Sequence, residues 1–490
     1  MYLVIALAAP FTAGYAQRIV QVPAGFGTIH SVIFGDTTST GARVDTNTIY
    51  VLHTDSLYIL DGSFEPTFPV IMESDGKPGT MPLIILGVPS GGTVPDQAIR
   101  PHADFYAKGI WFSAQAELNS GEGTRVFRFQ ENGIKISLDS CIISDASQAA
   151  FRLDTQNDVL VVKNCIIRDI GVVNGTGNGR AFDTRGNHVD SLIATNCTIY
   201  NLASRVVRQG GGSIDYAYFD HNTVDNLGQG GFDLTQVGWL YFTNNIIRNP
   251  EFLGSTDSTA TILQYSLEDS ASTPPIIRNN NIFSDSALVS AFPKTSTETI
   301  YLPKNFDSTS SYYMRQSGDS ATNISEQVDF TKGPKSPIDV MLNYYSSSSS
   351  TPLPMDTVDE ANFDFSYSHS YRSYKAGTEG KPLGSLIWFG LPTAIESNGV
   401  KKPTGYQLSQ NFPNPFNPTT RIEYFFPGSG AVTLKVYNVL GEVVASLVSG
   451  FQTAGDHTAV FNGQRLASGV YIYRLQSGDY SISRKMLLLK

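Results

Sequence analysis

The sequence predicts an all-β chain in which a parallel β-helix is followed by a small antiparallel β-sandwich. Two observations predict this fold class. A short strand-like pattern recurs through the middle of the chain at steps that suit stacked coils, and the last stretch, from Gly405 to Lys490, alternates strands with frequent turn signals. A chain of 490 residues is also too long for one ordinary hydrophobic core, so an elongated repeat fold with a second domain is expected.

The N-terminus predicts export. An apolar run from Tyr2 to Ala9 is followed by small residues at Gly14 and Ala16, a pattern typical of a signal peptide that is cleaved before Gln17. The run is much shorter than the ~20 residues that a membrane-spanning helix needs. We therefore expect a signal peptide at residues 1–16, although the usual positively charged start is missing.

One six-residue pattern predicts the coils. It has Cys or Asn at its second position and ends in Asp or Asn, which tolerate the left-handed turn conformation. Copies begin at Ser140, Asn164, Asn196, His221, Asn244 and Asn280, and a weaker copy begins at Lys108. Steps of 23 to 36 residues between copies suit a parallel β-helix, in which each coil adds one strand to each of several sheets.

A second column of apolar residues supports this register. It comprises Phe127, Phe151, Phe182, Val207, Phe232 and Ile262. Two coils reach the column seven residues late, because of insertions at Gly171–Gly179 and Phe252–Thr259, and the coil that begins at Lys108 reaches it eight residues late. Turns tolerate insertions that strands do not, so these loops are expected to leave the coil at one repeated corner.

The second position of the pattern predicts an internal ladder. Cys141, Cys165 and Cys197 share this position with Asn222, Asn245 and Asn281. At a coil spacing of ~4.8 Å, stacked Asn side chains hydrogen-bond to one another and satisfy buried amides. We expect three free thiols rather than a disulfide between stacked neighbours. No histidine partner indicates a catalytic thiol, and no spacing typical of a zinc site is present.

These coils resemble the right-handed parallel β-helix proteins of the pectate-lyase-like superfamily, over about Ile49 to Lys304 with a capping run-in from Arg18. The stretches 362–366 and 380–388 look like the closing segment of some secreted members. The chain lacks the Asp-Asp pair and the Gly-His-Gly of polygalacturonases and the Arg-x-Pro-x-x-Arg of pectate lyases. Asp220-His221 is similar to an Asp-His motif of that family, but His221 occupies the turn position that elsewhere holds Asn, which favours a structural role.

The C-terminal stretch carries its own motifs after a linker at residues 396–404. They are Gln410-Asn-Phe-Pro-Asn-Pro-Phe-Asn-Pro-Thr-Thr420, Val436-Tyr-Asn-Val-Leu-Gly441, Ala454-Gly-Asp-His457 and Leu466-Ala-Ser-Gly-Val-Tyr-Ile-Tyr-Arg474. Together they resemble the type A C-terminal sorting domain of type IX secretion cargo. The resemblance implies an Ig-like sandwich at 405–490 and export across the outer membrane of a Gram-negative bacterium by the type IX machinery. It also implies removal of the domain, followed by attachment to lipopolysaccharide or release.

The body of the chain, residues 17–395, is therefore where any activity is expected, as a β-helix with an N-terminal cap and a C-terminal closing segment. One outward column follows the apolar column, and it holds Arg128, Arg152, Asp183, Arg208 and Asp233. One interpretation is a ladder of ion pairs between parallel strands, each worth about 0.2–1 kcal/mol. The other is a sugar-binding groove walled by the two insertions.

The groove interpretation names candidate residues. Asp183 and Asp233, two coils or about 10 Å apart, are candidates for the paired carboxylates of a glycoside hydrolase. Arg208 joins them as a candidate catalytic cation, because a polysaccharide lyase must neutralise a uronate carboxylate. The candidate substrate-binding cations are Arg128, Arg152, Arg205 and Lys163.

Two functions stay open at this point. The first is a secreted or cell-surface protein that binds or degrades polysaccharide, and the second is a non-catalytic adhesin or surface-structure protein. The net charge of −10 disfavours nucleic acid as a partner, and we expect a monomer. No cofactor is indicated, and a calcium site would have to be assembled from separate coils because Asp-rich loops are absent from the sequence.

Overall fold

The computed structural model describes residues 18–45, 47–88, 92–117, 120–173, 178–267, 274–292, 301–346, 353–354, 363–391, 407–408, 411, 416, 418–426, 430–438, 442–452, 455–477 and 480–488. These residues fall into two compact units, one within Ala13–Thr393 and the other within Ala394–Lys490. The predicted signal peptide and linker lie outside the described residues.

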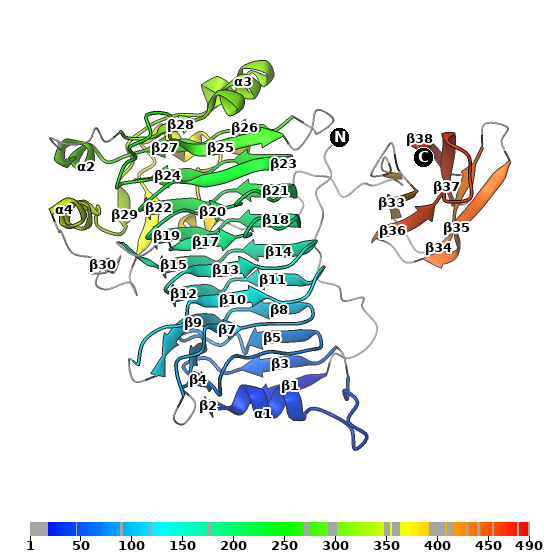
Figure 1. Cartoon of the computed structure of the whole chain (residues 1–490), viewed down its shortest axis with the longest axis horizontal. Helices are drawn as coiled ribbons and strands as arrows, with labels where there is room; N and C mark the ends of the chain where they lie inside the picture. The colour runs from blue at the N-terminus through cyan, green and yellow to red at the C-terminus, as the bar shows by residue number, and fades with distance from the viewer. Residues whose placement is uncertain are drawn as a thin grey trace. The chain divides into compact units, whose positions relative to one another are not determined.

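The first unit is a parallel β-helix, as the sequence predicts. Figure 1 shows its strands stacked from β1 at one end to β26 and β28 at the other. Every neighbouring pair in its two large sheets is parallel, with registers such as Leu160↔Leu192↔Ala217↔Leu240 running across successive coils. Each coil thus obtains its backbone hydrogen bonds from the coils above and below it.

The small sheet has ten described strands. They are β2 (Gly25–Phe26), β4 (Leu57–Leu60), β6 (Leu83–Leu86), β9 (Trp111–Ala116), β12 (Ile142–Ala146), β15 (Ile166–Ile170), β19 (Thr198–Leu202), β22 (Thr223–Leu227), β24 (Ile246–Arg248) and β27 (Asn281–Phe283). The six-residue pattern accounts for β12 to β27, since each copy leads into one strand of this sheet.

The large sheet has seventeen described strands and wraps around the rest of the coil. They are β1 (Ile19–Val22), β3 (Ile49–Leu52), β5 (Val70–Ser74), β7 (Gln97–Ile99), β8 (Phe105–Lys108), β10 (Arg125–Phe129), β11 (Lys135–Asp139), β13 (Ala149–Leu153), β14 (Asp158–Lys163), β17 (Arg180–Asp183), β18 (Val189–Thr195), β20 (Val207–Arg208), β21 (Ile214–Asp220), β23 (Phe232–Thr243), β25 (Thr261–Leu267), β26 (Ile276–Arg278) and β28 (Lys304–Phe306).

The apolar column forms the core of the coil. Phe127, Phe151 and Phe182 are fully buried, and their rings stack at centroid distances of 5.2 and 5.6 Å. Burying each such ring contributes about 1.5–3 kcal/mol. The predicted column is confirmed up to Phe232, which pairs with Leu263. The prediction of Ile262 for the next place in the column is wrong by one residue, because Leu263 holds that place.

The internal ladder is present, with a corrected register. The backbone N–H of each member donates to the side chain of the next: Cys197 to Asn222 (3.0 Å), Asn222 to Asn245 (2.9 Å) and Asn245 to Asn280 (3.0 Å). Asn280, not Asn281, belongs to the column, because three consecutive asparagines made the alignment ambiguous. Asn323, which the pattern does not reach, accepts from Asn280 and ends the ladder.

The weaker first copy shifts in the same way. Ile142 pairs with Trp111, so Gly109 rather than Lys108 corresponds to Ser140. Counted from Gly109, that coil reaches Phe127 seven residues late rather than eight. The three thiols are free and buried, and burial raises the pKa of Cys197 to about 12, which is consistent with a packing role.

Left-handed backbone conformations explain the polar ends of the pattern. The first position has φ between 51° and 58° at Ser140, Asn164, Asn196, His221, Asn244 and Asn279. The last position has φ between 51° and 61° at Asp145, Asp169, Asn201, Asn226 and Asn249. His221 therefore stands at a turn, where its Nδ1 lies 2.8 Å from an Asp220 carboxylate oxygen, as the structural interpretation expects.

Both ends of the coil are covered. α1 (Thr28–Gly35) buries Ile29 and Ile33 in the core beside β1 and β4, within the run-in that the sequence analysis expects to cap the first coil. At the other end α3 (Ser308–Ser317) packs on β25 and β26 through Met314, followed by η2 (Asp319–Thr322). α2 (Ser286–Ala291) and α4 (Ile338–Ser346) lie beside the insertion that contains Phe252 and Leu253.

The segment that resembles a closing segment packs against the small sheet. β31 (Asp364–Tyr367) pairs with β29 (Phe330–Lys332), and its Phe365 packs against Tyr200 and Ile246 on the outer face of the small sheet. η4 (Arg372–Lys375), η5 (Thr378–Gly380) and η6 (Leu386–Phe389) follow, and Trp388 Nε1 donates to Thr198 Oγ1 at 2.8 Å. This return segment, residues 363–391, covers part of the outer face of the small sheet. β16 (Val172–Val173) pairs with β30 (Leu353–Pro354).

The second unit is a two-sheet antiparallel module. One sheet contains β32 (Gln407–Leu408), β33 (Thr419–Phe426) and β36 (Gly455–Asn462), and the other contains β34 (Gly430–Tyr437), β35 (Val443–Gln452), β37 (Gly469–Ser477) and β38 (Tyr480–Leu488). Both sheets contribute to one core, with Ile422 from the first and Leu434 and Tyr473 from the second. The predicted sandwich is confirmed.

The ladder generates the first testable prediction. Asn245 is fully buried, accepts from Asn222 and donates to the Phe219 carbonyl at 3.0 Å. Asn245→Ala leaves these groups without partners, and we expect the free energy of unfolding to fall by about 3 kcal/mol in urea titrations. Asn343→Ala, at an exposed position of α4, serves as the matched control and should change it by less than about 0.5 kcal/mol. Equal effects at the two positions would contradict the ladder.

Candidate functional site

The first part of the predicted charged column is an ion-paired network. Arg128 and Arg152 are neighbours in register, and both guanidinium groups bind the carboxylate of Asp154 at 2.8 Å. The two arginines thereby share one counter-charge on the next turn of the chain. The ladder interpretation describes these two residues better than the groove interpretation does.

The second part of the column buries its carboxylate. Asp183 is only 2% exposed and lies between Arg180, at 3.0 Å, and Arg208, at 3.4 Å. A general base or nucleophile must reach its substrate, and Asp183 is enclosed by two guanidinium groups. The structure thus brings Asp183 and Arg208 together, but in an arrangement that stabilises the coil.

Lys163 lies away from this column. It ends β14 on another part of the large sheet, in register with Asp139 and Thr195, and burial lowers the pKa of its ammonium group. The remaining candidates, Arg205 and Asp233, lie close to each other. They line one hollow with an insertion loop, and we call this hollow the acidic corner.

The acidic corner has a volume of about 150 Å³ and lies where β20, β23 and β25 begin. Its lining residues are Arg205, Gly230, Gly231, Phe232, Asp233, Glu251, Ser255, Asp257, Ala260, Thr261 and Gln264. The insertion at 252–259 forms one wall, as the sequence predicts, and residues 174–177 of the insertion at 171–179 lie outside the described residues.

Two carboxyl groups in the corner differ in protonation. Burial raises the pKa of Glu251 to about 7, although Arg205 and the Gly230 amide oppose the shift. Asp257 is solvent-exposed, and hydrogen bonds from the Thr259 hydroxyl and amide lower the pKa of its carboxylate. At neutral pH Glu251 is therefore protonated in about half of the molecules, whereas Asp257 is ionised.

Backbone and side-chain geometry position the other groups. Glu251 adopts a left-handed conformation with φ 49°, which is uncommon for a glutamate and fixes the direction of its side chain. Asp233 accepts hydrogen bonds from the Gln209 amide (3.3 Å) and the Thr235 hydroxyl (3.2 Å). Among the described atoms, Arg205 Nε is buried without a hydrogen-bond partner, and the guanidinium group lies against Gly230.

Sequence reasoning missed Glu251 and Asp257. The available signal was the insertion itself, because Glu251 directly precedes Phe252–Thr259 and Asp257 lies within it. Functional groups concentrate on loops that a rigid scaffold positions. Acidic residues of the insertions were therefore better candidates than the regular column.

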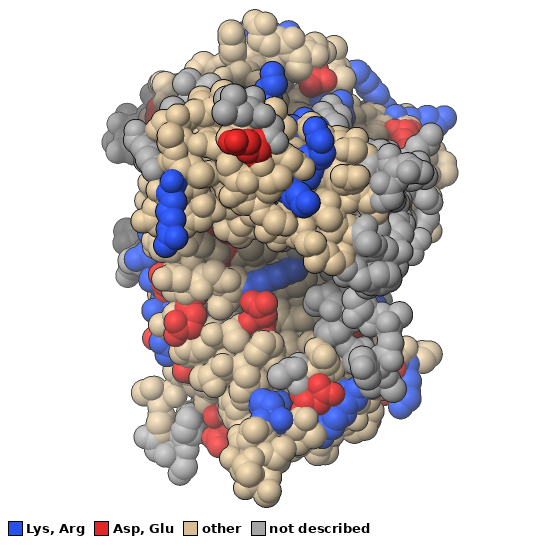
Figure 2. All heavy atoms as spheres, turned by 90° about the vertical axis from the view of Figure 1, so that its right-hand side faces the viewer, with Lys and Arg blue, Asp and Glu red and all other residues tan. Residues whose placement is uncertain are grey.

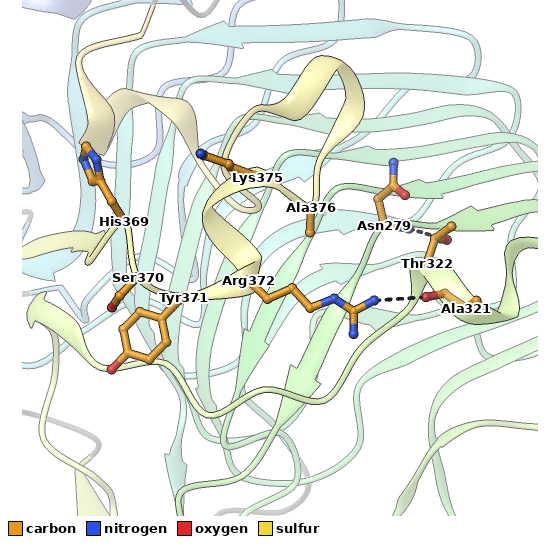
Figure 3. A pocket seen from close by; sticks show the side chains of 9 residues that line it. All are labelled: Asn279, Ala321, Thr322, His369, Ser370, Tyr371, Arg372, Lys375 and Ala376. Atoms are coloured by element: carbon orange, nitrogen blue, oxygen red, sulfur yellow. Dashed lines mark hydrogen bonds between the residues drawn. The ribbon is translucent and has the colours of Figure 1, made fainter.

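A second hollow, of about 530 Å³, lies between the return segment and the last coil (Figure 3). Figure 3 shows the Arg372 side chain extending across it to donate to the Ala321 carbonyl at 3.4 Å. Its described lining includes the basic residues His369, Arg372 and Lys375 but no carboxylate. This hollow suits an anionic group and lacks the paired carboxyls that acid–base catalysis uses.

Charge on the visible surface is mixed. On the face drawn in Figure 2, basic and acidic side chains are interspersed, and uncharged residues cover most of the described area. A nucleic-acid interface requires a concentrated basic stripe. No such stripe is visible among the described residues of this face.

The motifs of the C-terminal module serve its own packing. Phe416 is buried against Phe461, and its amide donates to the Leu487 carbonyl at 2.9 Å. Asn411 is buried, and its amide donates to the Tyr473 hydroxyl at 2.8 Å. A family model described as the secretion system C-terminal sorting domain matches residues 410–489.

The module is a sorting domain. It indicates export to the cell surface or the extracellular space and interaction with the type IX secretion machinery. No curated protein matches the chain. Among the described residues, no helix is both long and apolar enough to cross a membrane. The sorting domain thus indicates where the β-helix is delivered. Any binding or catalytic residues are expected in the coils of the β-helix.

The Asp183 network separates the two interpretations of the column. Asp183→Ala leaves the buried guanidinium group of Arg180 without this counter-charge, and we expect the free energy of unfolding to fall by about 3–5 kcal/mol. Asp233 lies two coils further on and is half-buried, so Asp233→Ala should lower the free energy of unfolding by about 1 kcal/mol or less. Chemical denaturation of both variants tests this contrast, and a stable Asp183→Ala would restore Asp183 as a site candidate.

Glu251 predicts a pH-dependent stability. The folded protein binds its proton up to about pH 7, whereas the unfolded chain releases it near the ordinary value of 4.5. The contribution of Glu251 therefore declines as pH rises from about 4.5 to 7, by at most about 3 kcal/mol. Glu251→Gln should remove this decline and melt above the wild type at pH 8, but not at pH 4. If the melting temperatures of the wild type and Glu251→Gln differed by the same amount at every pH in this range, the raised pKa of Glu251 would be refuted.

Proposed function

We propose that the exported β-helix binds polysaccharide at the acidic corner and hydrolyses its glycosidic bonds. One observation carries the proposal: Glu251, with a pKa of about 7, shares a hollow with the ionised carboxylate of Asp257, with Asp233 and with Arg205. Glycoside hydrolysis requires one carboxyl group that donates a proton and a second that is ionised.

Each residue has a role in the proposed reaction. Protonated Glu251 donates its proton to the oxygen of the leaving sugar, while Asp257 accepts a proton from the water that attacks the anomeric carbon. The bond between the anomeric carbon and the leaving oxygen breaks, the water hydroxyl bonds to the anomeric carbon, and the products are two shorter sugars. Asp257 then releases its proton to solvent and Glu251 takes one up, which restores both groups. Asp233 and the guanidinium group of Arg205 line the hollow and are candidates to bind sugar hydroxyl groups.

The charges favour hydrolysis over elimination. A lyase must neutralise a uronate carboxylate, whereas the corner combines three acidic side chains with a single arginine. A bound calcium ion would offset this excess, so calcium stays part of the proposal as an aid to acidic substrates. We further propose that the sorting domain is removed after export and that the β-helix is attached to lipopolysaccharide or released.

A second candidate function is a non-catalytic adhesin or surface-structure protein. The observation that favours it is the ion-paired column, in which Arg152 and Asp183 are already engaged with partners of the same chain. Such a column stiffens stacked coils without needing a ligand. A stiff β-helix of this kind would act through its length and rigidity, as an adhesin or a structural component of the cell surface.

A glycan screen decides between the two functions. The wild-type chain, Glu251→Gln and Asp257→Asn are incubated with neutral and uronate-containing glycans, with and without calcium. New reducing ends and absorbance of unsaturated products are both recorded. We expect new reducing ends that fall at least about 100-fold in Glu251→Gln, since general acid catalysis contributes 10²–10⁴-fold.

The matched control is Glu131→Gln, because Glu131 is exposed beside His102 and far from the acidic corner in register. It should retain wild-type turnover. Unsaturated products would establish a lyase instead, and binding or inertness without any product across the panel would favour the adhesin.

A further inference from the structure

A histidine and two aspartates from neighbouring coils converge outside the acidic corner. His188 directly precedes β18, Asp190 lies in β18, and Asp215 lies in β21. The two strands are parallel neighbours, with Val189 opposite Ile214 and Ser191 opposite Tyr216, so the two aspartates occupy equivalent positions on adjacent coils. The side chains are each between 30% and 38% exposed.

The geometry is that of a three-ligand metal site. His188 Nε2 lies 3.4 Å from Asp190 Oδ1 and 3.5 Å from Asp215 Oδ1, and one ligand atom from each residue lies within 4.8 Å of the others. Zinc binds nitrogen and carboxylate oxygen at about 2.0–2.2 Å in tetrahedral geometry, which places neighbouring ligand atoms roughly 3.4 Å apart. The two measured separations, 3.4 and 3.5 Å, match this distance between neighbouring ligand atoms.

The imidazole is held by a contact that points Nε2 at the carboxylates. Its Nδ1 lies 2.7 Å from the Ser213 hydroxyl, and the Val189 amide donates to the Ser213 carbonyl at 2.9 Å, so this partner is tied to the same strand. Histidine ligands of metals are oriented in this way through their second nitrogen. The Ser213 contact is outside the ligand group and is independent of the distances within it.

The surrounding charge also favours a cation. Asp190 and Asp215 stand side by side on adjacent strands, where two like charges repel each other. A divalent ion would remove the repulsion between these carboxylates.

We infer that His188, Asp190 and Asp215 bind one divalent transition-metal ion of the zinc class, with a fourth position left to water. One imidazole and two carboxylates suit zinc better than calcium, which takes six to eight oxygen ligands. The ion links two coils on the large sheet. It is separate from the acidic corner, so the inference does not depend on the proposed hydrolysis.

His102 provides a matched control within the same protein. It also lies between two carboxylates, but Glu131 contacts its Nδ1 (3.1 Å) and Glu65 approaches its Nε2 (3.9 Å). Carboxylates on opposite ring nitrogens cannot share one ion with that ring. His102→Ala should therefore leave metal binding unchanged.

Calorimetric titration with zinc chloride tests the inference, using the full chain without a polyhistidine tag. We expect one zinc ion per chain and an increase in melting temperature on binding. His188→Ala and Asp215→Asn should each weaken zinc binding by at least about tenfold, and Ser213→Ala should weaken it about tenfold through loss of ring orientation. Calcium chloride should not displace the zinc ion from this site, and any calcium bound at the acidic corner should be unchanged by Asp215→Asn.

Two results would overturn the inference. The first is an absence of zinc binding by the wild-type chain, which would identify the cluster as an ion pair of protonated His188. The second is undiminished zinc binding in both His188→Ala and Asp215→Asn. Asp215→Asn preserves side-chain volume, so it keeps the test valid if His188→Ala fails to fold, and circular dichroism checks each variant.

Discussion

The stacking of one coil on the next is the constraint on which the rest of the structure depends. Hydrogen bonds between parallel strands satisfy most backbone N–H and C=O groups. Each turn, however, also buries backbone N–H groups that have no partner in a neighbouring strand. The ladder that runs through Asn222, Asn245 and Asn280 supplies their acceptors from the next coil. The thiols of Cys141, Cys165 and Cys197 occupy the same column on earlier coils, where the Cys165 sulfur accepts from the Cys141 amide at 3.3 Å.

A coil fixed in this way leaves freedom only at its corners and on its outer face. The insertion that begins after Glu251 adds residues while β23 and β25 remain paired, with Phe232 opposite Leu263, and it creates the wall of the acidic corner. Strain is also stored there, since Glu251 itself has a positive φ. The candidate chemistry thus lies where the repeat is interrupted.

The repeat could be predicted because its residue types follow directly from backbone conformation and burial. Positive φ selects Asn, Asp or Gly at the turns, and alternation selects Phe127 and its successors for the core. Single-residue errors arose where the pattern was degenerate, as in Asn279-Asn280-Asn281. The position of the return segment could not be predicted, because the contact of Phe365 with Tyr200 joins residues far apart in the chain without any periodicity.

Candidate sites were harder to predict because burial and partners, not column position, decide what a carboxylate does. Asp183 and Asp233 are equivalent in register, yet Asp183 is enclosed by Arg180 and Arg208 whereas Asp233 lines an open hollow. The difference comes from Arg180, which lies three residues before Asp183 on the same strand; its counterpart before Asp233 is Gly230. A glycine at that place removes the cation and makes room for Arg205, whose guanidinium group lies against Gly230. One substitution in the repeat therefore changes a structural ion pair into a solvent-accessible carboxylate beside a cation.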